Sequence, residues 1–256
     1  MQICQKLKNL RASQIASFLM REFNQNKVKY IIEEFKELGF TKESLVSDKN
    51  NLFQFLVLVS FDRRPFSPYE IVWNLDNPQS VFSVLKRNGL LELSRMDVLS
   101  EDELDRTLEK LTVKNLHLNY LDLAKRIRTA KTMKQLASNI DGIFSILRNL
   151  KSGLDVIKLH RMIDKVNGIG STIAAKFIMY TVRCMGIGNI NPSEYSILAE
   201  YLKSEWRNSK WVRQLKMAGI LKEVEEELKD DLFAFDYFWD LDRYYCSLKK
   251  CNECGL

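Results

Sequence analysis

The chain has 256 residues, of which 46% are apolar and 11% aromatic, enough to bury the core of one large domain or two small ones. Its 39 lysines and arginines exceed its 33 aspartates and glutamates, and the net charge of +6 is compatible with a nucleic-acid partner without requiring one. This composition excludes a disordered chain, and five cysteines are too few for a disulfide-rich scaffold.

The first residues, MQICQKLKNL, are charged and polar where a secretion signal would have an uninterrupted apolar run. The longest strongly apolar stretch, residues 56–61, is far shorter than the roughly 20 residues that cross a bilayer. We therefore expect a protein without membrane contact, located inside the cell in the cytoplasm, nucleoid or nucleus.

Apolar spacing predicts helices in the first quarter of the chain. Residues 2–24 are weakly helical in pattern, and residues 28–38 have helical spacing that ends at Gly39, a residue favoured just after a helix. Residues 51–61 are apolar all round, which fits either a buried strand or a buried helix. We favour the helix because the segments that follow start like helices.

Three later sites have the residues of a helix start, and no turn typical of a strand hairpin is present. These sites are Ser67-Pro68, Asn77-Pro78, and Ser100 with Glu103. The expected helices are 66–75, 78–88, 100–112, 117–131, 133–138, 141–150 and 154–166. The sequence therefore predicts an all-α protein.

Charge is distributed unevenly along these helices. Residues 125–134 contain five basic residues and no acidic one, whereas residues 222–242 contain nine acidic residues and two lysines. We expect one basic face and one acidic face.

Residues 159–180 read as a helix, a tight turn at Asn167-Gly168-Ile169-Gly170 and a second helix. The glycines allow positive φ and close backbone approach, while Ile169 can fill the space between the helices. Amide groups at the start of the second helix suit a phosphate, because orphan N–H donors and the helix dipole favour an anion there. In the alternative interpretation the glycines only make the turn of a packed hairpin.

The hairpin has the order apolar residue, any residue, Gly, apolar residue, Gly, three residues, Ala. This order resembles the helix-hairpin-helix of the DNA glycosylase superfamily that includes endonuclease III. The residues that carry it are Val166, Gly168, Ile169, Gly170 and Ala174.

The order of the helices also resembles the six-helix barrel of that superfamily. The resemblance implies two helical subdomains with a substrate cleft between them. The barrel would comprise residues 50–185 and end in the helix-hairpin-helix, while residues 1–49 would pack with the carboxy-terminal subdomain, residues 186–256.

The resemblance further implies a monomer that binds double-stranded DNA carrying a damaged or mismatched base. Arg63 and Arg64 follow the buried helix, where the family places residues that fill the gap left by an extruded base; an ordinary basic loop is the alternative. The hairpin residues expected to contact DNA are Gly168, Ile169, Gly170, Ser171 and Thr172.

The chemistry implied is hydrolysis of the N-glycosidic bond of the damaged base. In the superfamily an essential aspartate lies at a helix start after the hairpin, and here Asn191-Pro192 opens a helix with Glu194 in its first turn. That carboxylate would stabilise positive charge on the sugar as the base leaves. Alternatively, Glu194 closes a capping box with Asn191.

Bifunctional members of the family also use a lysine, four residues after the first hairpin glycine, that forms a Schiff base with the sugar. Here that position is Thr172, and Lys176 lies one turn further on the same face. Lys176 is therefore a candidate nucleophile, or else a solvated surface lysine. The presence of threonine instead of lysine at residue 172 favours a glycosylase with weak or no lyase activity. It also leaves a non-catalytic DNA-binding protein as the alternative function. A protein-interaction domain that never meets DNA is disfavoured by the basic run.

Residues 235–239 resemble the aspartate-and-tryptophan helix near the end of archaeal 8-oxoguanine glycosylases; an aromatic run of this spacing can equally be core. The tail resembles the iron–sulfur loop of endonuclease III, with three cysteines instead of four, and predicts an iron–sulfur cluster or zinc, or else a metal-free tail. A fourth ligand would have to come from Cys184 or Cys4. The tail cysteines are Cys246, Cys251 and Cys254. His117 and His160 fit structural roles.

Overall fold

The computed structural model describes residues 10–62, 72–74, 76–114, 123–188, 190, 194, 201, 210–229 and 231–241. Every regular element in these residues is a helix and none is a strand, so the predicted all-α class is confirmed. The helices fall into two compact units. The first contains the described residues within 1–32, 152–154 and 190–256, and the second those within 33–151 and 155–189. None of the described helices combines the length and the apolar character that a membrane crossing needs.

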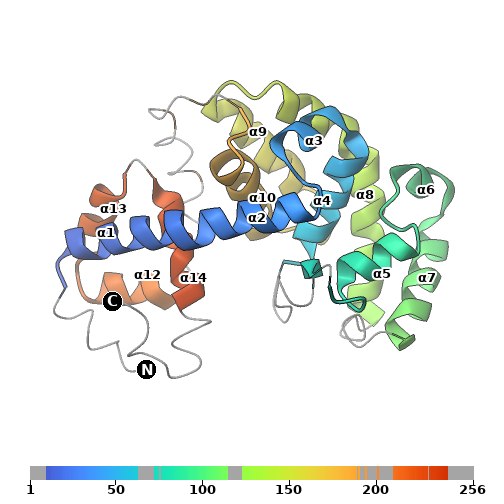
Figure 1. Cartoon of the computed structure of the whole chain (residues 1–256), viewed down its shortest axis with the longest axis horizontal. Coiled ribbons are helices and arrows are strands. Elements are labelled where there is room, and N and C mark those ends of the chain that lie inside the picture. The colour runs from blue at the N-terminus through green and yellow to red at the C-terminus, as the bar shows by residue number, and fades with distance from the viewer. Residues whose placement is uncertain are drawn as a thin grey trace. The chain divides into compact units, whose positions relative to one another are not determined.

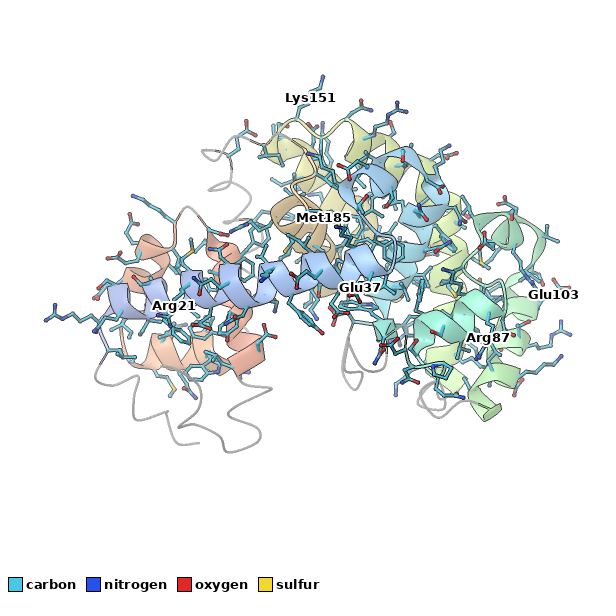
Figure 2. All side chains as sticks on the ribbon, viewed as in Figure 1. Arg21, Glu37, Arg87, Glu103, Lys151 and Met185 are labelled. Atoms are coloured by element: carbon cyan, nitrogen blue, oxygen red, sulfur yellow. The ribbon has the colours of Figure 1, made fainter. Side chains whose placement is uncertain are left out.

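The second unit is built around two helices, α4 and α8. Its elements are α3 (Lys42–Ser47), α4 (Lys49–Ser60), α5 (Val81–Arg87), α6 (Leu93–Val98), α7 (Glu101–Lys114), α8 (Leu123–Arg148), α9 (Gly153–Asp164, of which residues 155–164 belong to this unit), α10 (Ser171–Ile178) and the π-helical η4 (Met179–Cys184). α4 contacts α3, α8 and α10, and α8 also contacts α6 and α7 (Figure 1). Charged side chains such as those of Lys151 and Glu103 point outward (Figure 2).

The packing of α4 explains why residues 51–61 are apolar on every side. All residues from Leu52 to Ser60 are buried, because other helices cover the whole circumference of α4. The helix interpretation of residues 51–61 is therefore confirmed.

α8 is a single helix of 26 residues, where three separate helices were predicted. The prediction was wrong at the two boundaries that it placed at residue 132 and at residues 139–140, where α8 continues without interruption. A Cβ added to Gly142 would lie 3.3 Å from the sulfur of Met162 on α9, so the glycine lets α9 pack closely against α8. This packing offsets the cost of about 1 kcal/mol that glycine carries inside a helix.

Helix starts were predicted with mixed success. Ser100 and Glu103 do form a capping box: the Glu103 N–H donates to the Ser100 hydroxyl, and the Ser100 N–H donates to the Glu103 carboxylate at 2.9 Å. The hydrogen bonds that the Glu103 carboxylate accepts from Ser100 lower the pKa of Glu103. The expected start at Asn77-Pro78 was wrong, because α5 begins at Val81 and Ser80 caps it. The Asn77 side chain instead accepts the Gln79 N–H at 2.9 Å and forms a turn.

The first unit is organised on α1. Its elements are α1 (Ala12–Glu22), the π-helical η2 (Phe23–Val28), the start of α2 (Lys29–Glu37), α12 (Lys210–Met217), α13 (Leu221–Glu227), the 3₁₀ helix η5 (Leu232–Asp236) and α14 (Tyr237–Asp240). α1 contacts α13, η5 and α14 (Figure 1). Aromatic pairs fill its core: Trp211 stacks on Phe238 at 5.4 Å, and Phe18 meets Tyr237 edge-on at 6.1 Å.

The second unit begins at Glu33, within α2. Aromatic packing joins this part of the chain to α4. Phe35 and Phe40 are buried against Phe55 of α4, with ring centroids 5.0 Å and 5.3 Å apart.

Candidate nucleic-acid interface

The hairpin joins α9, which ends at Asp164, to α10, which begins at Ser171. The chain turns tightly there, since the Ile169 N–H donates to the Val166 carbonyl at 3.0 Å. Ile169 is 4% exposed and packs inward, as the sequence predicts. Gly168 has φ of +83°, a conformation that favours glycine, whereas Gly170 is extended with φ of −97° and precedes α10 as its N-cap.

α8 holds the turn from one side. The Thr132 hydroxyl donates to the Asn167 carbonyl, and the Asn167 N–H donates to the Gln135 side-chain oxygen at 2.6 Å. A Cβ on Gly168 would overlap the Thr132 hydroxyl and lie 2.9 Å from Cγ of Arg128. Gly168 is therefore required by the turn and by its contact with α8.

Gly170 differs from Gly168 in both respects. Its φ is negative, and a Cβ added there would meet no atom within 4 Å. Its N–H donates no hydrogen bond to the described residues, and the first turn of α10 contains no acidic side chain. Neither backbone conformation nor internal packing requires a glycine here, so the exposed backbone at Gly170 is open to an external group such as a phosphate.

The remaining hairpin residues begin α10. The Ser171 carbonyl accepts a hydrogen bond from Nε2 of His160 at 3.1 Å, and His160 is 2% exposed. This contact ties α9 to α10 and agrees with a structural role for His160; His117 lies outside the described residues. Thr172 is exposed at the position where bifunctional glycosylases have their lysine.

Lys176 points at a buried carboxylate. Its Nζ lies 3.0 Å from Oδ1 of Asp62 and donates to the Asp62 carbonyl at 3.1 Å, while the Tyr180 hydroxyl donates to Oδ2 of Asp62 at 2.5 Å. Asp62 is 2% exposed and the Lys176 side chain 26%. The end of the Lys176 side chain is therefore engaged by Asp62.

Asp62 directly follows the cap of α4 and directly precedes Arg63 and Arg64, which lie outside the described residues. Lys176 and Tyr180 thus anchor the chain at the point where that basic pair begins. Lys176 is four residues from Thr172, which is about 6 Å along the helix. The start of the basic segment and the hairpin are therefore both fixed to the helix that begins at Ser171.

Glu194 contacts the start of α9. Its Oε2 accepts the N–H of Gly153, the first residue of α9, and both residues belong to the first unit. Glu194 is half-buried. The expected partner Asn191 lies outside the described residues.

Sequence reasoning missed an ion-pair cluster in the first unit. Lys27 of η2 contacts Asp236, and its Nζ lies 2.8 Å from Oδ2 of Asp240. Burial lowers the pKa of Lys27, but the two carboxylates outweigh it and the net pKa is raised. Phe235, Tyr237 and Phe238 are buried, so these three aromatic residues belong to the core. A weak signal existed, because two aspartates four residues apart in an aromatic helix need a cation.

The metal prediction concerns Cys246, Cys251 and Cys254, which lie outside the described residues. Within the described ranges, no three histidine, cysteine, aspartate or glutamate side chains are grouped so as to hold a metal ion. Comparisons with protein-family models, with curated proteins and with solved structures found no match for this chain.

Proposed function

We propose that this chain binds double-stranded DNA through the hairpin between α9 and α10, with the backbone at Gly170 facing a phosphate. The observation that carries the proposal is the difference between the two glycines. Gly168 is explained by its φ and by α8, whereas Gly170 has an open surface and an N–H without an internal acceptor. The resemblance to the helix-hairpin-helix motif supports the same assignment.

A pair of variants at Gly170 tests the binding site. Gly170→Asp places a carboxylate where the phosphate would lie, and it is expected to weaken binding to duplexes of every sequence by about tenfold, or 1.4 kcal/mol. Gly170→Ala is the matched control: its Cβ fits, and it should weaken binding much less. Both Kd values can be measured by fluorescence anisotropy. Wild-type affinity in a folded Gly170→Asp variant would contradict the proposal.

Base excision is the second candidate function, and Glu194 is the observation that favours it. A half-buried carboxylate held by the Gly153 N–H is a fixed negative charge of the kind that stabilises a sugar cation while a base departs. The enzyme would be a DNA repair glycosylase without strong lyase activity, because Thr172 has no amine and Lys176 is paired with Asp62. Extrusion of the base costs a few kcal/mol, least for a damaged base. The substrate cleft that the resemblance implies is part of this proposal.

Glu194→Gln separates the catalytic role from the capping role. Glutamine keeps an oxygen that can accept the Gly153 N–H but removes the charge, so folding and DNA binding should be retained. If Glu194 acts on the sugar, excision should fall by about 100-fold. Single-turnover excision on duplexes carrying a panel of lesions measures this. A wild-type protein that binds every duplex and excises no base would establish the non-catalytic alternative.

Borohydride trapping is expected to capture little covalent adduct, because Thr172 has no amine and Lys176 is held in an ion pair with Asp62. Strong trapping that disappears in Lys176→Ala would instead identify Lys176 as the nucleophile.

A further inference from the structure

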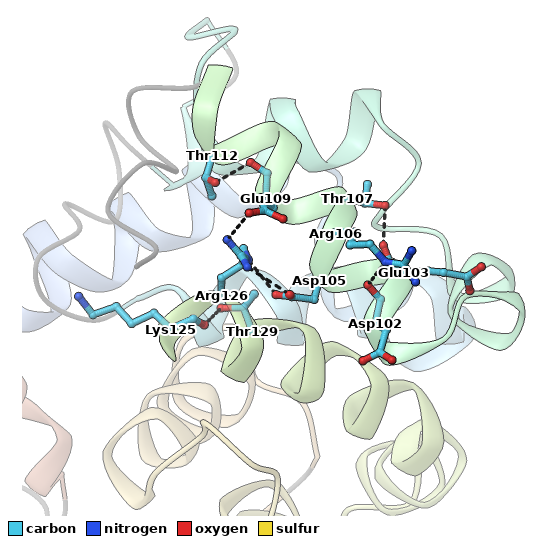
Figure 3. A network of polar contacts seen from close by, with 10 residues as sticks. All are labelled: Asp102, Glu103, Asp105, Arg106, Thr107, Glu109, Thr112, Lys125, Arg126 and Thr129. Carbon is cyan, nitrogen blue, oxygen red and sulfur yellow. Dashed lines mark hydrogen bonds and ion pairs between the residues drawn. The ribbon is translucent and has the colours of Figure 1, made fainter. Parts of the chain in front are cut away.

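The five basic residues between 125 and 134 have two different roles in the structure. Arg126 is 12% exposed and forms ion pairs with Asp105 at 2.9 Å and with Glu109 at 3.3 Å, which join α8 to α7 (Figure 3). Lys134 donates to the carbonyls of Met96 and Leu99 at the end of α6, the latter at 2.6 Å. These two cations are used inside the second unit.

The other three, Lys125, Arg128 and Lys131, occupy a different face of α8. At about 100° per residue, Lys125 and Lys131 each lie about 60° from Arg128, whereas Arg126 lies about 160° from it. Lys125 and Arg128 are exposed and Lys131 is half-buried. In Figure 3 the Lys125 side chain extends away from the Arg126 network. Neither Arg128 nor Lys131 forms an ion pair with the described residues.

This face adjoins the hairpin. Arg128 lies against Gly168, and Thr132 and Gln135, which hold Asn167, continue the same face. These direct contacts, all within one unit, fix the position of this face of α8 relative to the hairpin backbone. A group bound at the hairpin would meet positive charge along α8.

We propose that Lys125, Arg128 and Lys131 form a second contact surface for the duplex that the hairpin binds, and that they engage neighbouring phosphates. This inference rests on the proposed function. The three residues span about 9 Å along the helix axis, the length of two or three phosphates of one strand at about 3.4 Å of rise each. The phosphates of a DNA strand fit this surface, because they bind to a row of positive charges and need no pocket. The contacts position the protein and read no sequence.

The salt dependence of binding tests this surface. Each phosphate contact contributes about 0.9 to the slope of log K against log salt concentration. Arg128→Gln and Lys131→Gln are each expected to reduce the slope by about 0.9, and the double variant by about 1.8, for all sequences alike. Glutamine keeps the aliphatic stem that packs beside Gly168, so the fold should be preserved.

Arg148→Gln is the matched control. Arg148 is an exposed arginine on the same helix, 20 residues from Arg128 and thus about 30 Å away, and its replacement removes the same charge. It should leave the slope unchanged. Thermal unfolding of each variant shows that the fold is intact.

The outcomes distinguish the two proposals. If Gly170→Asp weakens binding and the double variant keeps the wild-type slope, the α8 surface is wrong and the hairpin site stands. If Arg148→Gln lowers the slope as much as Arg128→Gln, the slope depends on the net charge of the protein and not on the position of the charge. The proposed α8 surface is then also wrong. If the wild-type protein binds no duplex, both proposals fail.

Discussion

Lys27→Ala is expected to destabilise the protein by about 3–5 kcal/mol, because it leaves Asp236 and Asp240 beside each other without their cation. The Lys27 and Asp236 side chains are only 13% and 6% exposed, so water cannot replace the lost ammonium. Urea unfolding followed by circular dichroism measures the loss. Lys216→Ala, an exposed lysine of the same unit, is the control and should change stability by less than about 0.5 kcal/mol. A loss below about 1 kcal/mol for Lys27→Ala would show that the cluster is solvated in solution.

The pH dependence of this cluster follows from the raised pKa of Lys27. A lysine whose pKa is raised by folding stabilises the protein fully below the ordinary lysine pKa of 10.5, and the effect disappears only as pH rises through the folded pKa. The stability difference between wild type and Lys27→Ala should therefore be constant between about pH 6 and pH 9. A difference that shrinks across this window would contradict the raised pKa.

Local patterns were sufficient where the cause of a structure is local. The capping box of Ser100 and Glu103 and the helical period of α9 involve residues three or four apart, and both were predicted. The short helices α3 and α6, each of six residues, were not predicted, because so short a segment has little period to recognise. The boundaries predicted at residue 132 and at residues 139–140 were wrong, because contacts that stabilise a continuous α8, such as the packing of Met162 against Gly142, come from another helix.

The candidate site also combines residues that local patterns could locate with contacts that such patterns could not predict. The hairpin residues were located from their order in the sequence, but the partners that define their roles are distant. Thr132 is 35 residues from Asn167, and Asp62 is 114 residues from Lys176. No local window contains such a pair. The sequence could thus nominate Lys176 as a lysine on the right face, and only the fold reveals that a buried carboxylate binds it.

Gly168→Ala is expected to destabilise the second unit by about 2–4 kcal/mol. A left-handed conformation costs an L-residue about 1–2 kcal/mol, and the new methyl group also overlaps the Thr132 hydroxyl that holds Asn167. Gly170→Ala, two residues away, should be nearly neutral, since neither condition applies there. Thermal or urea unfolding of the two variants side by side measures the contrast.

Thr132→Ala separates the two causes. It removes the hydroxyl that the new methyl group meets, so Gly168→Ala should cost less in the Thr132→Ala background than in the wild type, while the strain of the positive φ and the close contact with Cγ of Arg128 should remain. An equal cost in both backgrounds would mean that the Thr132 hydroxyl does not press on the turn. That result would weaken the conclusion that α8 holds the hairpin in place, which a DNA surface shared between the hairpin and α8 requires.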